Sequence, residues 1–190
     1  MPAHSAALRS SVIPAVPGPT RLRLPDLLHI TDQHADDVLN RRYDHLLPAT
    51  GIPANDRWFT RLHSDDELDV WLISWVPGET TELHDHSGSL GAMTLLTGAL
   101  HEFRWTGDQL RRRRLAAGDQ AAFPLGWVHD VTWAPFGAGS SHVSTGSSHV
   151  STLSVHAYSP PLTAMSYYEI TERDTLRRVR TELTDTPEGR

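Results

Sequence analysis

The sequence predicts a mainly β protein, a sandwich or barrel of short strands with a helix near each end. Short apolar segments rich in β-branched and aromatic residues begin near residue 57, and turn residues separate them at spacings of roughly 8–12 residues. Segments with helical periodicity flank this region. A chain of 190 residues is long enough for one domain with a sizeable core. We therefore expect residues 1–20 to form a mobile arm and residues 21–190 a single domain, with its core at about 57–170.

The two predicted helices lie at residues 24–42 and 171–183. Pro25 suits the first turn of the first helix, and Thr171 is a candidate N-cap of the second. Apolar or aromatic side chains recur at helical spacing in both segments. They are Leu27, Ile30, His34 and Val38 in the first segment, and Leu176, Val179 and Leu183 in the second.

Strands are predicted between these helices. "ALHEFRW" and "QLRRRRL" flank the turn residues Thr-Gly-Asp, which indicates a hairpin. "AAFPLGWVHDVTW" indicates a strand, a turn and a second strand. The remaining predicted strands are "DVWLISW" (69–75), "GAMTLLTG" (91–98) and "STLSVHAYS" (151–159), the last of which ends at two prolines.

The composition narrows the class of protein. The net charge is −6 and the pI about 6.0, which argues against nucleic-acid binding and against attachment to a membrane surface. No apolar run approaches the roughly 20 residues that a spanning helix needs, and the N-terminus lacks the apolar core of a signal peptide. The chain has no cysteine, so disulfides, thiolate ligands and cysteine nucleophiles are excluded. We expect a cytoplasmic monomer.

Two further features have simple structural interpretations. "SSHVST" occurs at 140–145 and again at 147–152, which indicates a local duplication in one loop or strand, with His142 and His149 at the surface. The run from Arg111 to Arg114 is interpreted as a solvated face of the hairpin.

Two histidines in "ELHDHSGSLG" are the first candidates for a functional site. His84 and His86 are two residues apart, so in a strand both side chains lie on one face and Asp85 on the other. Such a pair offers two preformed nitrogen ligands, but in a chain with 12 histidines the pair alone is a weak signal. A third histidine, His129, follows in "PLGWVHD".

The residues around these histidines resemble the two-part signature of the cupin superfamily. The first part is G-x5-H-x-H-x3–4-E-x6-G and the second is G-x5-P-x-G-x2-H. The matching positions are Gly78, His84, His86 and Gly98 in the first part, and Gly118, Pro124, Gly126 and His129 in the second. The resemblance implies a jelly-roll type of β-barrel with the three histidines meeting inside it. Gly91 stands where the family has its glutamate ligand, so the implied centre has three neutral ligands and favours an anionic one such as a thiolate.

A second constellation lies in "LSVHAYSPPL". Ser154, His156 and Tyr158 alternate along one predicted strand and therefore share one face, where they can form a hydrogen-bond relay. A Ser-His nucleophile pair is a poor interpretation, because no acid orients the histidine and no nucleophile elbow is present. A buried, hydrogen-bonded polar cluster with no catalytic role is the other open alternative.

Together with the cupin motifs, this stretch resembles the cysteine dioxygenase family, in particular its bacterial branch. The resemblance covers roughly residues 57–170 and includes the "YSPP" that follows the relay. It implies Fe(II) held by His84, His86 and His129, and a non-haem thiol dioxygenase that uses O2 and converts L-cysteine to cysteine sulfinic acid. Ser154, His156 and Tyr158 would be the catalytic relay.

The resemblance also implies a substrate pocket. "RWFTRL" resembles the segment with the carboxylate-binding arginine, which is Arg61 here. Phe59 stands where the family often has a phenol, and Met165 where some members have a smaller residue. Trp75 and Ile73 are expected to form the wall of this pocket.

Three alternatives remain open. The thiol could be mercaptopropionate, cysteamine or a thiol-imidazole. The chain could be another cupin enzyme, an isomerase or a carbon-cleaving dioxygenase, although those usually keep the glutamate. It could also be a non-catalytic cupin that binds a ligand without a metal.

Overall fold

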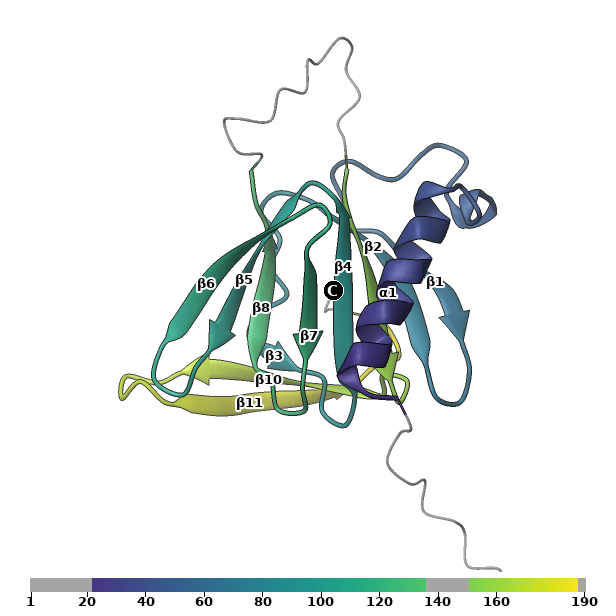
Figure 1. Cartoon of the computed structure of the whole chain (residues 1–190). Helices are drawn as coiled ribbons and strands as arrows, with labels where there is room; N and C mark the ends of the chain where they lie inside the picture. Colours follow the sequence, from purple (N-terminus) through teal and green to yellow (C-terminus); the bar gives the residue numbers. More distant parts are fainter. Residues whose placement is uncertain (1–21, 136–150, 188–190) are drawn as a thin grey trace, which may run out of the picture.

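The computed structural model describes residues 22–135 and 151–187, which form two facing β-sheets with one helix on the outside (Figure 1). The five-stranded sheet has the order β1-β2-β9-β4-β7 and the six-stranded sheet the order β11-β10-β3-β8-β5-β6. The strands of the first sheet are β1 (Phe59–Ser64), β2 (Asp69–Trp75), β9 (Thr152–Ser159), β4 (Leu90–Thr97) and β7 (Gln120–Phe123). Those of the second are β11 (Leu176–Leu183), β10 (Ala164–Ile170), β3 (His84–Asp85), β8 (His129–Trp133), β5 (Ala99–Trp105) and β6 (Leu110–Ala116). All strand pairs within the sheets are antiparallel.

The five-stranded sheet is covered on both faces, because one face meets the second sheet and the other meets the helix. Side chains alternate along β9, so Ser154, His156 and Tyr158 face the second sheet while Val155 and Ala157 pack under the helix. Every residue of β2 is buried for the same reason. The space between the sheets, here called the interior, holds the candidate functional residues.

The predicted N-terminal helix is confirmed as α1 (Leu24–Leu39), three residues shorter than expected. The Asp26 carboxylate accepts a hydrogen bond from the Arg23 backbone N–H at 2.7 Å, which stabilises the first turn. The helix buries Leu27, Thr31 and Ala35 against β4 and β9. This helix supports the outer face of the sheet from which the Ser-His-Tyr line projects inward.

The predicted C-terminal helix at 171–183 is wrong. Residues 171–175 form a turn in which the Thr171 N–H donates to the Thr175 carbonyl at 2.9 Å, and β11 then pairs with β10 from Leu176 opposite Ile170 to Leu183 opposite Ala164. Apolar residues three and four apart fit a helix locally, but the edge of β10 offers this segment a full ladder of backbone hydrogen bonds. Tertiary pairing thus overrides the helical periodicity.

The predicted jelly-roll type of cupin fold is confirmed, with one correction. The two sheets face each other but are not joined by hydrogen bonds into a closed barrel within the described residues. The predicted arm at 1–20, and His142 and His149 of the duplicated segment, lie outside the residues that the structure describes. In the described part of the chain, no helix is long and apolar enough to cross a membrane.

Candidate metal centre

The three predicted histidines meet in the interior. His84 in β3 lies directly opposite His129 in β8, and His86 follows β3 immediately. All three are buried, and their candidate ligand atoms lie within 4.8 Å of one another. Asp85 faces away from this group, as predicted, because its carboxylate accepts hydrogen bonds from the Ser87 N–H and the Tyr168 hydroxyl. The arrangement can hold a metal ion.

Hydrogen bonds at the Nδ1 atoms fix which nitrogen is available to a metal. The Nδ1 of His84 lies 2.9 Å from the carbonyl oxygen of Glu82, and a carbonyl oxygen can only accept a hydrogen bond. The Nδ1 of His129 lies 3.1 Å from the Glu102 carboxylate, and its Nε2 is buried without a hydrogen-bond partner among the described residues. Both rings therefore carry their proton on Nδ1 and present the Nε2 lone pair, as metal ligands do. The donor set fits a divalent ion of the first transition row.

Glu102 is a functional candidate that the sequence analysis missed. Its carboxylate, 1% exposed, accepts hydrogen bonds from His129, from Trp127 Nε1 at 3.2 Å and from the Arg113 guanidinium. Burial raises the pKa of this carboxyl, but the hydrogen bond from His129, the charge of Arg113 and the hydrogen bond from Trp127 lower it to about 2. Glu102 is thus a buried anion that orients His129. Its signal in the sequence is an acid two residues after Leu100, at an inward position of β5.

Ser154, His156 and Tyr158 form the predicted relay, and Trp75 extends it. The Trp75 indole N–H donates to Ser154 Oγ at 2.8 Å, Ser154 Oγ lies 2.9 Å from His156 Nε2, and His156 Nδ1 lies 3.2 Å from the Tyr158 hydroxyl. All four side chains are buried. The Tyr158 ring lies 4.9 Å from the His86 ring, between centroids, so the relay ends beside the histidine group.

Gly91, at the position of the cupin glutamate, lies against Tyr158. Gly91 is the register partner of both Tyr158 in β9 and Phe123 in β7. A Cβ at this position would lie 2.9 Å from a Phe123 ring carbon and 3.3 Å from a Tyr158 ring carbon. The Tyr158 and Phe123 rings therefore occupy the space that a glutamate ligand would need.

Arg61 lies in the same row of the sheet as His156. Register partners across three strands run from Arg61 to Trp71 to His156, a row here called the His156 row. The Cζ of Arg61 lies 4.4 Å from the centre of the Trp71 ring, and its Nη2 donates to the backbone carbonyl of Asp185 at 3.0 Å. The carboxylates of Asp69 and Asp185 each lie 3.7 Å from the guanidinium, and the side chain is 37% exposed. Arg61 is thus at the rim of the interior.

A second arginine, Arg57, also lies against the relay, and the sequence analysis missed it. Its Cζ lies 4.4 Å from the centre of the Trp75 ring, and Trp75 donates to Ser154. Arg57 lies two residues before β1, so strand alternation gives no signal for it.

The other predicted pocket residues are brought into the interior. Phe59 meets the Trp71 ring edge-on, with centroids 5.8 Å apart, and Ile73 is the register partner of both Phe59 and Ser154. Met165 is fully buried on β10, two residues before Tyr167, whose ring lies 6.2 Å from the His84 ring. All of these side chains belong to the apolar cluster of the interior or pack against it.

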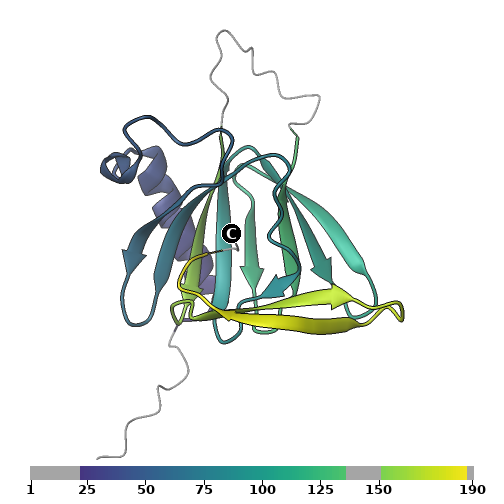
Figure 2. The ribbon, with the colours of Figure 1, turned by 180° about the vertical axis from the view of Figure 1, so that it is seen from behind.

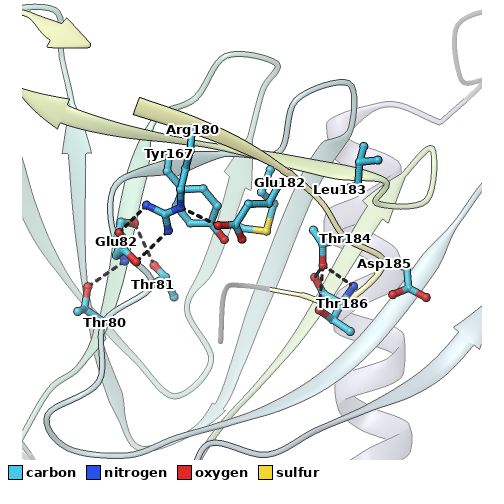
Figure 3. Close-up of a pocket in the computed structure, with 11 residues that line it drawn as sticks. Thr80, Thr81, Glu82, Tyr167, Arg180, Glu182, Leu183, Thr184, Asp185 and Thr186 are labelled. Atoms are coloured by element: carbon cyan, nitrogen blue, oxygen red, sulfur yellow. Dashed lines mark hydrogen bonds and ion pairs between the residues drawn. The ribbon is translucent and has the colours of Figure 1, made fainter. Parts of the chain in front are cut away.

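A cavity of about 730 Å³ lies next to this cluster, between the β10–β11 hairpin, residues 80–82 and the chain after β11 (Figure 3). Met165 and Tyr167 line it, and Arg180 crosses it, with its guanidinium 3.0 Å from the Glu82 carboxylate and over the Tyr167 ring. Figure 2 shows the chain bending away from the hairpin after β11. In this segment the backbone carbonyl of Asp185 accepts a hydrogen bond from Arg61. None of the three histidines lines the cavity, but the ring of its lining residue Tyr167 lies 6.2 Å from the His84 ring, between centroids.

The two facing sheets and the buried histidine group define a cupin with a candidate metal centre. A family model described as cysteine dioxygenase type I matches residues 54–171, so the chain belongs to the cysteine dioxygenase family. No curated protein sequence matches the chain significantly.

Solved structures with similar folds include a protein with a double-stranded β-helix domain from Klebsiella pneumoniae, at 18% identity and a TM-score of 0.44, covering 62% of this chain and 85% of that one. Another is KdgF from Halomonas sp., at 14% identity and a TM-score of 0.44, covering 60% of this chain and 93% of that one. A cupin superfamily protein from Desulfitobacterium hafniense has 14% identity and a TM-score of 0.42, covering 56% of this chain and 79% of that one.

Proposed function

We propose that this protein is an Fe(II)-dependent thiol dioxygenase that converts L-cysteine to cysteine sulfinic acid. The reaction is R–SH + O2 → R–SO2⁻ + H⁺, in which sulfur loses four electrons and O2 gains four, so no other reductant is required. The observation that carries the proposal is the three-histidine group beside Tyr158, in a chain that belongs to the cysteine dioxygenase family. His84, His86 and His129 would hold the iron.

Bound there, Fe(II) would supply open coordination positions for the substrate thiolate and for O2, and a route for electrons between them. Three neutral imidazoles leave the +2 charge of the ion uncompensated, so the centre attracts an anionic ligand. Glu102 would hold His129 in its orientation without binding the ion itself.

The hydrogen-bond relay would direct the proton of the Tyr158 hydroxyl toward the substrate. The Trp75 N–H can only donate, so Ser154 accepts from it and can donate its own O–H in a hydrogen bond to His156 Nε2. His156 then carries its proton on Nδ1 and donates to the Tyr158 oxygen. In this order the Tyr158 O–H is directed away from His156 and can donate to an oxygen or carboxylate of the reacting substrate.

Arg61 would pair with the carboxylate of the substrate, since a guanidinium matches a carboxylate with two parallel hydrogen bonds. The substrate would have to replace the contact between Arg61 and Asp185. Phe59, Ile73, Trp75 and Met165 would form the apolar walls that exclude water. Mercaptopropionate and other carboxylate thiols fit the same arrangement.

The proposal is tested by oxygen consumption of the Fe(II)-loaded protein with L-cysteine, 3-mercaptopropionate and cysteamine, with the mass of each product. We expect one O2 consumed per thiol and a product heavier by two oxygen atoms. His86→Ala should lose both iron and activity. Tyr158→Phe should keep its iron but turn over about 10²-fold more slowly. Loaded wild-type protein that consumes no oxygen with any thiol would contradict the proposal.

A further inference from the structure

Trp71 has a feature that the proposed function does not use. Its side chain is only 5% exposed, and its indole nitrogen is buried with no hydrogen-bond acceptor among the described residues. A buried indole N–H normally has an acceptor, and leaving it without one destabilises the folded protein. The acceptor is therefore expected to come from outside the described chain.

The neighbours of Trp71 define what that acceptor can be. Trp71 lies in the His156 row, between Arg61 on β1 and His156 on β9. The Arg61 guanidinium stacks over its ring with Cζ 4.4 Å from the centroid, and the Phe59 ring meets it edge-on. The Asp69 and Asp185 carboxylates each lie 3.7 Å from the guanidinium, but neither accepts a hydrogen bond from the indole N–H. Phe59 has no polar group to offer, so the indole N–H and the guanidinium are the donors among these three side chains. An anionic acceptor that reaches both donors suits this arrangement.

We propose that Trp71 is a specificity-determining residue of the thiol site, whose indole N–H binds, together with Arg61, the carboxylate of the substrate. This inference rests on the proposed function and narrows its substrate class to thiols that carry a carboxylate. Stacking on the Trp71 ring also restricts the Arg61 side chain before the substrate binds. Arg61 therefore loses less conformational entropy on binding. The indole N–H thus provides the neutral donor that Phe59 cannot provide.

The test compares the binding of two thiols of similar size, 3-mercaptopropionate and cysteamine, to iron-loaded protein without oxygen, by titration calorimetry. Trp71→Phe removes the N–H and keeps an aromatic ring under Arg61. We expect its Kd for 3-mercaptopropionate to rise about tenfold or more, as for a hydrogen bond to a charged group, and its Kd for cysteamine to change less than about twofold. Trp58→Phe is the matched control, because Trp58 packs on the helix side of the sheet, and it should bind both thiols as the wild type does.

A double variant tests whether the two residues act together. If both bind one carboxylate, the effects of Trp71→Phe and Arg61→Gln on 3-mercaptopropionate binding should be clearly non-additive. Equal weakening of both thiols, or no change for 3-mercaptopropionate, would overturn the inference while leaving the thiol dioxygenase intact. Failure of the wild-type protein to bind any thiol would instead contradict the proposed function.

Discussion

Gly91 leaves room for the two aromatic rings beside it. A Cβ at position 91 would lie 2.9 Å from a Phe123 ring carbon and 3.3 Å from a Tyr158 ring carbon, so a larger side chain there would have to displace these rings. In this backbone, the glutamate of the cupin signature does not fit at position 91 without such a shift.

Replacement of Gly91 by alanine should destabilise the protein. The added Cβ would approach Phe123 to 2.9 Å, and overpacking of a well-filled core costs about 1–3 kcal/mol. The measurement is urea unfolding of the metal-free protein. Gly88→Ala is the control, because a Cβ there meets nothing within 4 Å. Equal stability of the two variants would show that the Gly91 space is not filled as described.

Glu102 should affect metal affinity through His129. Glu102→Gln keeps the shape but removes the negative charge that the Nδ1–H of His129 contacts, so we expect iron affinity to fall about 10–100-fold. Competition with a coloured chelator measures this affinity. Glu169→Gln, at an exposed ion pair with Arg177, is the control. An unchanged affinity in Glu102→Gln would mean that His129 is oriented without this carboxylate.

At the scale of elements, some strands are predicted well from the sequence. They are the strands with alternating side chains and the strands that are apolar along most of their length. The predicted 69–75 and 99–105 coincide with β2 and β5, because their composition favours strands and turn residues border them. The segment 171–183 was mispredicted because its local periodicity fits a helix, while its partner, β10, becomes visible only when the chain is folded. The two strands are neighbours in the sequence, but the spacing of Leu176, Val179 and Leu183 fits a helix better than the alternation of a strand.

The segment after β11 should compete with the substrate for Arg61. Asp185 accepts a hydrogen bond from Arg61 with its backbone carbonyl, and its carboxylate lies 3.7 Å from the guanidinium. A chain that ends at Leu183 lacks both contacts and should bind 3-mercaptopropionate more tightly. The gain should be at most about fivefold, because the contact is exposed to solvent. Calorimetry without oxygen measures the change, with cysteamine as the control ligand. Weaker or unchanged binding would indicate that the segment does not compete at this site.

At the scale of the whole molecule, the histidine group joins strands that lie far apart in the sequence. The two-residue strand β3 pairs with β10 at two positions and with β8 at one, where His84 lies opposite His129. A metal that binds the folded state alone should stabilise it by about 2.7 kcal/mol at a free concentration of 100 times Kd. We expect added Fe(II), without oxygen, to raise the Tm of the wild type and not that of His86→Ala. An equal rise in both proteins would place the metal elsewhere.

The parts of the site that could be predicted are those whose residues lie within one short segment of the chain. The three histidines and the Ser-His-Tyr line were identifiable because each group has a fixed spacing within its own short segment. Glu102 and Trp71 were not, because their roles depend on contacts with other strands: Glu102 reaches His129 in β8, and Trp71 lies between Arg61 and His156. Arg61 was identified by resemblance, but its contact with Asp185 became visible only with the C-terminal hairpin in place.

The central claim is that both atoms of one O2 molecule are transferred to the sulfur of a thiol. The most direct measurement is turnover of L-cysteine by the iron-loaded protein under ¹⁸O2 in ordinary water, with mass spectrometry of the product. We expect a sulfinate in which both added oxygen atoms are ¹⁸O. A product with one labelled oxygen, or a disulfide with no added oxygen, would contradict this claim.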